Sequence, residues 1–138
     1  MDIKRWTDDL SVENDVLDGH HKRLFDLLGD VTRVVDRDGG LHEVVTLFQA
    51  LNDYIGYHFR TEEAMMEVAD FPFLELHRHS HQTIAMRVQD MADSLTEANH
   101  AAVARELGQF LSGWLVHHIE IEDFEYRPYV GGQGGAGH

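Results

Sequence analysis

A histidine and a glutamate stand four residues apart in the stretch Tyr57–Glu63. Because four residues make about one helical turn, His58 and Glu62 leave the same face if this stretch is helical. Burying an unpaired imidazole or carboxylate is costly, so both groups need a strong compensating partner in a core. A metal ion is one such partner. The other residues on this face are apolar: Val44, Leu47, Leu51, Tyr54, Ile55 and Met65.

Three further segments carry histidine on an apolar helical stripe. A single buried histidine is usually satisfied by one hydrogen bond. Several buried histidines are harder to satisfy, because the backbone groups of helices are already paired and cannot bond to many imidazoles. Two metal ions bridged by carboxylates would use all the inward ring nitrogens, so the pattern predicts a two-metal centre. Together, the core-facing histidines of the four segments are His21, His58, His77, His81 and His118.

The side-chain types in the sequence limit which metals could bind. The chain has no cysteine, so thiolate ligands and disulfides are excluded. Histidine, carboxylate and water favour iron, manganese, copper or zinc over an iron–sulfur cluster. Three other histidines lie off the stripes. His20 is expected at the margin of the core or in solvent, His79 is expected in solvent, and His117 lies about 100° off its stripe.

Four amphipathic segments with short connections must position these groups. Their apolar residues recur at helical spacing, and neither a β-type alternation nor an internal repeat stands out. The pattern predicts an all-α fold, an up-down-up-down four-helix bundle. The expected helices cover residues 18–36, 41–67, 73–95 and 99–127.

The expected ends of these helices follow from local chemistry. Asp18 is a plausible N-cap of the first helix, and Pro128 should stop the last one. Residues 1–16 hold a few apolar side chains among polar ones, which predicts an extended arm packed across the domain. We expect one domain over residues 1–130 and a flexible Gly-rich tail over residues 131–138.

Composition excludes several classes of protein. With 138 residues the chain is long enough for one domain with a real core. Its formal charge of −14 is poorly suited to nucleic acid or anionic lipid. No apolar run approaches the ~20 residues of a membrane span, so membrane insertion is not expected. The first residues lack the apolar stretch of a signal peptide, which makes the cytoplasm the expected location.

The ordered set of motifs resembles the hemerythrin family, including its bacterial members. The resemblance extends from residue 6 to about residue 127, and it includes the N-terminal arm. A His-x3-Glu pair alone is a weak signal, whereas the set in this order is highly specific. The matching motifs are DGHHKRLF at 18–25, HFRTEE at 58–63, His77-x3-His81 and WLVHHI at 114–119 followed by Asp123.

The resemblance implies reversible O2 binding at a non-haem di-iron site. An oxo or hydroxo group would form a third bridge between the two iron ions, and one iron would keep an open position for O2. The iron with the open position would be held by His21 and His58. The other iron would be held by His77, His81 and His118, with Glu62 and Asp123 bridging the two.

Spacing and resemblance disagree about the second carboxylate. In an ideal helix Glu122 lies about 40° from His118, on the core face, and Asp123 about 140° away. Spacing alone therefore selects Glu122, and the family pattern His-x4-Asp selects Asp123. We follow the family pattern, with the hypothesis that a one-residue bulge distorts the helix between His118 and Asp123. A regular helix with Glu122 on the metal would refute it.

Several functions are compatible with such a centre. The resemblance favours a non-enzymatic O2 carrier, store or deliverer, with possible delivery to a redox enzyme and a monomeric chain. The alternatives are a peroxidase-like or nitric-oxide-handling di-iron enzyme, and a sensor domain for O2, nitric oxide or redox state in which the arm moves. A bundle that holds zinc for structure alone is a further alternative.

Overall fold

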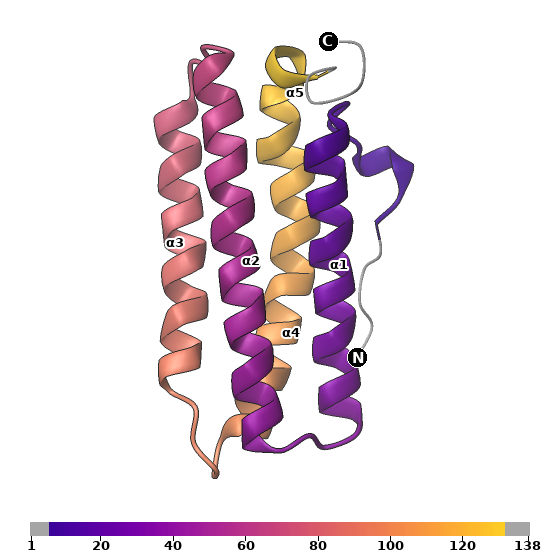
Figure 1. Cartoon of the computed structure of the whole chain (residues 1–138), viewed down its shortest axis with the longest axis vertical. Helices are drawn as coiled ribbons and strands as arrows, with labels where there is room; N and C mark the ends of the chain where they lie inside the picture. The colour runs from indigo at the N-terminus through magenta and orange to yellow at the C-terminus, as the bar shows by residue number, and fades with distance from the viewer. Residues whose placement is uncertain (1–5, 132–138) are drawn as a thin grey trace.

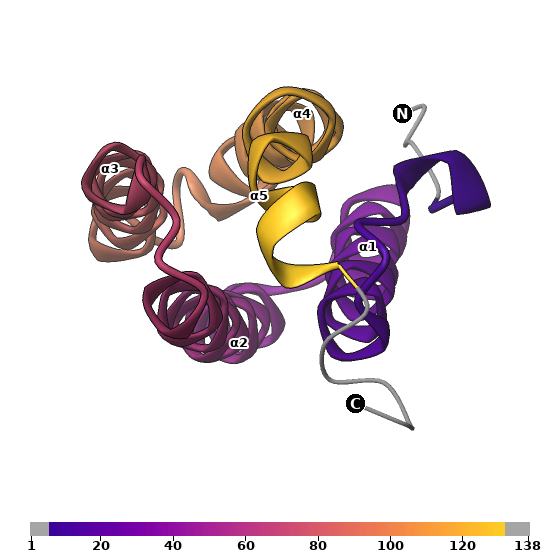
Figure 2. The same cartoon turned by 90° about the horizontal axis from the view of Figure 1, so that it is seen from above.

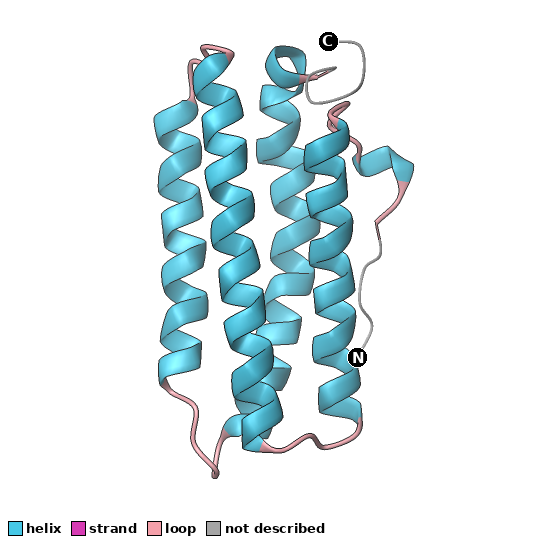
Figure 3. Ribbon diagram, viewed as in Figure 1, coloured by secondary structure: helices cyan, strands magenta, loops and turns pink. Residues whose placement is uncertain are grey.

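Four long helices stand side by side in the computed structural model, which describes residues 6–131 of the chain. Over these residues the elements are helices and no strand is present (Figure 3). The chain runs down α1, up α2, down α3 and up α4, which confirms the predicted bundle (Figure 1). The bounds are η1 (Asp8–Leu10), α1 (Asp15–Asp36), α2 (Leu41–Val68), α3 (Leu74–Asp93), α4 (His100–His117), η2 (His118–Asp123) and α5 (Phe124–Val130).

The neighbours in the bundle follow from this order. Helix α1 packs against α2 and α4, and α3 packs mainly against α2. Viewed along the helices, α5 lies over the space enclosed by the bundle (Figure 2). No helix in the described part of the chain combines the length and apolar character that crossing a membrane requires.

Helix α1 begins three residues earlier than expected, at Asp15, so the prediction of Asp18 as N-cap is wrong. The cap is Asn14, whose side chain accepts a hydrogen bond from the Leu17 N–H at 3.1 Å. Asp18 instead ties down the arm: its carboxylate accepts hydrogen bonds from the Ser11 hydroxyl at 2.5 Å and the Val12 N–H at 2.9 Å. An acidic side chain one turn into the helix can do this because it faces the incoming chain.

The end of the last helix also differs from the prediction. Helix α5 includes Pro128 and ends at Val130, so the expected stop at Pro128 is wrong. A proline removes only its own N–H and crowds the carbonyl four residues before it. That cost is small in the final turn, and Gly131 N–H closes the helix on Arg127 O at 2.8 Å.

The arm packs as predicted where the structure describes it. Leu10 and Val12 are buried, although Asp8–Leu10 form a short 3-10 turn rather than fully extended chain. Residues 1–5, and residues 132–138 of the predicted tail, lie outside the described residues.

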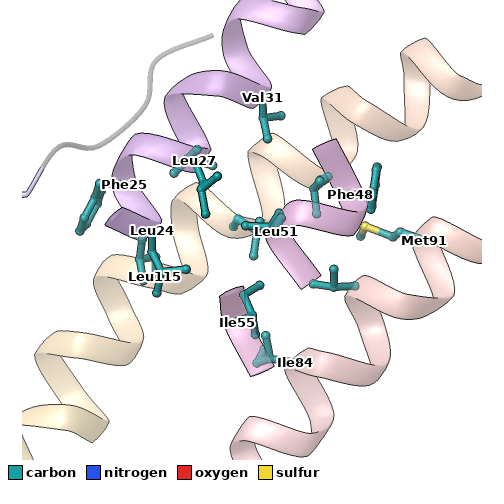
Figure 4. Packing of buried hydrophobic residues seen from close by; sticks show 14 of the residues in the cluster. Leu24, Phe25, Leu27, Val31, Phe48, Leu51, Ile55, Ile84, Met91 and Leu115 are labelled. Atoms are coloured by element: carbon teal, nitrogen blue, oxygen red, sulfur yellow. The ribbon is translucent and has the colours of Figure 1, made fainter. Parts of the chain in front are cut away.

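Apolar side chains fill the bundle in two clusters. The larger one occupies most of its length and brings together residues of all four helices (Figure 4). The smaller one lies at the end that carries α5 and consists of Val12, Leu17, Met66, Phe71, Tyr126 and Val130. Along α2, Ile55 and Phe59 belong to the larger cluster and Met66 to the smaller one. The buried polar residues His58 and Glu62 lie where the larger cluster gives way to the smaller one, so a polar layer has apolar packing on both sides.

Candidate metal centre

The Glu62 carboxylate lies at the middle of the polar layer and is completely buried. Its Oε2 faces two rings, with His21 Nε2 at 3.3 Å and His58 Nε2 at 3.4 Å. Its Oε1 faces two others, with His81 Nε2 at 3.0 Å and His77 Nε2 at 3.9 Å. The two oxygens of one carboxylate thus point at two different groups of imidazoles.

Asp123 repeats this arrangement from the fourth helix. Its Oδ2 lies 3.1 Å from His21 Nε2, and its Oδ1 lies 3.0 Å from both His77 Nε2 and His118 Nε2. Like Glu62, it has no exposed surface. The two carboxylates therefore join a two-histidine group (His21 and His58) to a three-histidine group (His77, His81 and His118).

All seven predicted residues are buried and converge on this one place. Glu62 with the two-histidine group, and Glu62 with the three-histidine group, each present ligand atoms within 4.8 Å of one another. The role of these residues as metal ligands stays a prediction, and the geometry that it requires is present.

The unpaired polar atoms of the layer test whether a metal fits. Among the described residues, several buried ligand atoms lack a hydrogen-bond partner although other polar atoms lie close by. Native cores rarely leave such atoms unpaired, so each needs an explanation. One explanation is that the lone pairs of these atoms are directed at cations that they share. The donor set of imidazole nitrogen and carboxylate oxygen suits iron. The unpaired atoms are Glu62 Oε1, both oxygens of Asp123, and Nε2 of His77, His81 and His118.

Asp123 reaches the centre because η2 is a π-helix. In a π-helix each N–H bonds the carbonyl five residues earlier, so residues five apart share a face. The Phe124 N–H accordingly bonds Ile119 O. The predicted one-residue bulge between His118 and Asp123 is confirmed, and the selection of Glu122 from ideal spacing is wrong.

The same bulge also turns an apolar side chain outward. Ile121 is 53% exposed. The wider turn rotates every residue after His118 relative to an α-helix, which carries Ile121 outward as it carries Asp123 inward. Glu122 ends half-buried at the edge of the layer, where its carboxylate accepts a hydrogen bond from the Ser80 hydroxyl at 2.8 Å.

Comparison with known proteins agrees with this geometry. The family model described as "Hemerythrin HHE cation binding domain" matches residues 12–130. The chain belongs to the hemerythrin family. It is 31% identical to a bacteriohemerythrin of Stenotrophomonas maltophilia over 94% of this chain and 83% of that one. It is 30% identical to a bacteriohemerythrin of Pseudomonas aeruginosa over 91% and 80% of the two chains.

Solved structures of hemerythrin variants share the fold of this family member. One crystal structure of a hemerythrin mutant superposes with a TM-score of 0.81, covering 95% of this chain and 99% of that one at 23% identity. This likeness concerns the fold alone, and it supports the four-helix arrangement around the polar layer.

His20 of this hemerythrin-family chain is buried, so its expected place at the margin or in solvent is wrong. Its Nδ1 lies 3.0 Å from Nδ1 of His58, and its ring packs beside Tyr54 and Tyr57. A position about 100° off the stripe becomes interior because these tyrosines of α2 cover it. His79 is exposed, as predicted, and His117 is exposed as well.

Tyr126 is a residue that sequence analysis missed. It is fully buried in α5, and its hydroxyl donates a hydrogen bond to Glu62 Oε2. Its ring also lies beside that of His77. Its position could have been found only from the π-helical register, since it follows Asp123 by three residues on the same face.

Without a cation, the carboxylates of the layer favour protonation of three of its histidines, whose pKa values they raise. Burial lowers the pKa of His21, but the closely approaching Asp123 and Glu62 carboxylates outweigh it and raise that pKa to about 9. The same opposition raises the pKa of His77 to about 9 and of His118 to about 10. Burial would raise the pKa of Glu62, but the neighbouring histidines hold it well below its usual value. Cations could replace these protons.

A cavity of about 120 Å³ opens beside the three-histidine group. One ring of that group, His77, forms part of its wall. Such an opening offers an entry path for a metal ion or small molecule, and its acidic side chains suit a cation. The other lining residues are Phe71, Phe73, Leu76, Glu122 and Glu125.

Proposed function

We propose that the chain binds O2 reversibly at a non-haem di-iron site. The supporting observation is the division of the ligand atoms: Glu62 and Asp123 each turn one oxygen to the two-histidine group and one to the three-histidine group. Two carboxylates arranged in this way would bridge two iron ions. Bound ferrous iron would supply the electrons that O2 binding requires.

The unequal groups define where O2 would bind. An iron held by three histidines and both carboxylates would have one protein ligand more than an iron held by two histidines and the same carboxylates. The two-histidine iron would therefore be the one with room for O2. Five neutral imidazoles and two carboxylates also donate less charge than the carboxylate-rich sites of related bundles that cleave O2. This ligand set supports binding without cleavage.

Apolar packing surrounds the open side. A small cavity of about 10 Å³ lies one helical turn from His21 and His58 and is lined only by apolar side chains. An apolar cavity of this size has room for about one water at most and offers it no polar partner, so it stays dry. Exclusion of water would slow irreversible oxidation of the iron. The lining residues are Leu24, Leu28, Leu51, Ile55, Leu111, Trp114 and Leu115.

An anaerobic optical titration with iron counting tests the proposal. Metal-free protein is loaded with Fe²⁺, and iron per chain is measured. We expect two irons and a visible band that appears with O2, disappears on its removal, and returns over many cycles. Fewer than two irons, or a band that never reverses, would contradict the proposal.

Turnover assays separate the carrier from the alternatives. Sustained consumption of peroxide or nitric oxide would assign an enzyme instead. Delivery to a redox enzyme, a monomeric state and a cytoplasmic location stay predictions.

A further inference from the structure

The Nδ1 atoms of the histidines proposed as iron ligands have different neighbours in the two histidine groups. All five imidazoles turn Nε2 toward the bridging carboxylates, so each carries its ring proton on Nδ1 when Nε2 binds a metal. The Nδ1 atoms face outward, where some of them meet a second layer of side chains. The acceptor there sets the orientation of the ring and its strength as a ligand.

Two histidines of the three-histidine group are backed by carboxylates. His81 Nδ1 lies 2.8 Å from Glu63 Oε2, and the other oxygen of Glu63 accepts a hydrogen bond from Arg78 Nε at 3.1 Å. His118 Nδ1 lies 2.7 Å from Glu122 Oε2, a close contact that is not a straight hydrogen bond. Arg78 therefore holds the first carboxylate in place, as Ser80 holds the second.

The two-histidine group has no such backing in the contacts of the described residues. His58 Nδ1 meets Nδ1 of His20 at 3.0 Å, so a neutral ring accepts its proton. His20 is in turn held between the rings of Tyr54 and Tyr57. The Nδ1 atom of His21 is buried and lacks a hydrogen-bond partner among the described residues.

A carboxylate close to Nδ1 polarises the imidazole through its charge and makes Nε2 the stronger donor, whereas a neutral neighbour does so far less. Building on the proposed di-iron function, we propose that Glu63 and Glu122 make the three-histidine position the high-affinity one, filled first. His20 is the neutral positioning residue of His58, and it leaves the O2-binding position as the weaker one. The two metal positions would thus differ in affinity, although they share both bridging carboxylates.

Stepwise binding of Co²⁺ tests this division without O2 or turnover. Metal-free protein is titrated anaerobically with Co²⁺ by calorimetry and visible absorption. We expect two steps, with His58→Ala keeping the tighter step and His81→Ala losing it. Glu63→Gln, which keeps an acceptor oxygen but removes the charge, should weaken the tighter step about 10- to 100-fold.

Two further variants complete the experiment: Glu67→Gln is the control, and His20→Leu should affect the weaker step instead of the tighter one. Glu67→Gln removes a carboxylate that also faces Arg78, at 3.8 Å, but contacts no metal-centre histidine, so both steps should keep their wild-type affinities. His20→Leu should weaken the second step and spare the first. The unfolding temperature of each metal-free variant separates loss of folding from loss of binding.

The outcomes distinguish the two proposals. If wild-type protein binds two Co²⁺ but Glu63→Gln weakens both steps equally, or neither, the division is overturned while the two-metal centre stands. A weaker first step with His20→Leu would overturn it as well. Binding of fewer than two Co²⁺ by wild-type protein would overturn the proposed function and this inference together.

Discussion

Nε2 of His118 lies 3.0 Å from Oδ1 of Asp123, although the two residues are five apart in the chain. Only a π-helical turn places such a pair on one face, and η2 supplies it. The bulge therefore decides which acidic residue enters the metal centre and which stays at its edge.

Replacement of each acidic residue should show this difference. Asp123→Ala removes a carboxylate that faces both histidine groups, so we expect fewer than two irons per chain. Glu122→Ala removes a half-buried carboxylate outside the centre, so we expect two irons at saturating Fe²⁺. Iron analysis after anaerobic loading and gel filtration measures both. Equal iron content in the two variants would refute the assignment.

The metal-free protein should lose stability as pH rises from about 6.5 to about 9. The pKa values of His21 and His77 are about 9 in the folded state, where burial is outweighed by Asp123 and Glu62, against 6.5 for an ordinary histidine. The folded state therefore holds more protons in this range, and stability falls with rising pH. We expect a loss of more than about 1 kcal/mol in the free energy of unfolding.

Urea unfolding at pH 6.5, 7.5 and 9 measures this slope. Protein loaded with two metals should show a much smaller fall, because the cations have displaced the protons. A flat profile for metal-free protein would contradict the charge pairing in the polar layer.

Tyr126→Phe should destabilise the metal-free bundle. The change removes the hydroxyl that donates to Glu62 Oε2 and leaves a buried carboxylate oxygen with one donor fewer. Loss of a buried hydrogen bond to a charged group costs about 1.5–3 kcal/mol. Urea unfolding measures the effect, with Tyr57→Phe, at a ring that is 50% exposed, as the matched control. Equal stability of the two variants would count against the bond.

Leu24→Ala should speed the irreversible oxidation of iron. Leu24 lines the small apolar cavity near His21, so its truncation admits water to the open side. Leu107→Ala, at a fully buried position that does not line this cavity, is the control. Both variants should lose about 2–5 kcal/mol of stability. Only Leu24→Ala should shorten the lifetime of the oxygenated band, followed optically; equal lifetimes would refute a water-excluding role.

The sequence by itself determined the all-α bundle and the five histidines that meet in its core. Helical periodicity is local, so the second helix was expected at 41–67 and is found at Leu41–Val68. Histidines one turn apart, such as His77 and His81, must share a face wherever the helix packs. For this reason spacing alone brought five imidazoles inward.

Only the tertiary structure decided the details that depend on neighbours or on irregular backbone. Ideal spacing selects Glu122, and the family pattern was needed to choose Asp123, because a π-turn changes the register of all residues after it. His20 is buried because Tyr54 and Tyr57 of another helix cover it, which no local pattern records. The outer contacts of the histidines likewise join residues far apart in the chain, so their unequal charge could be seen only after folding.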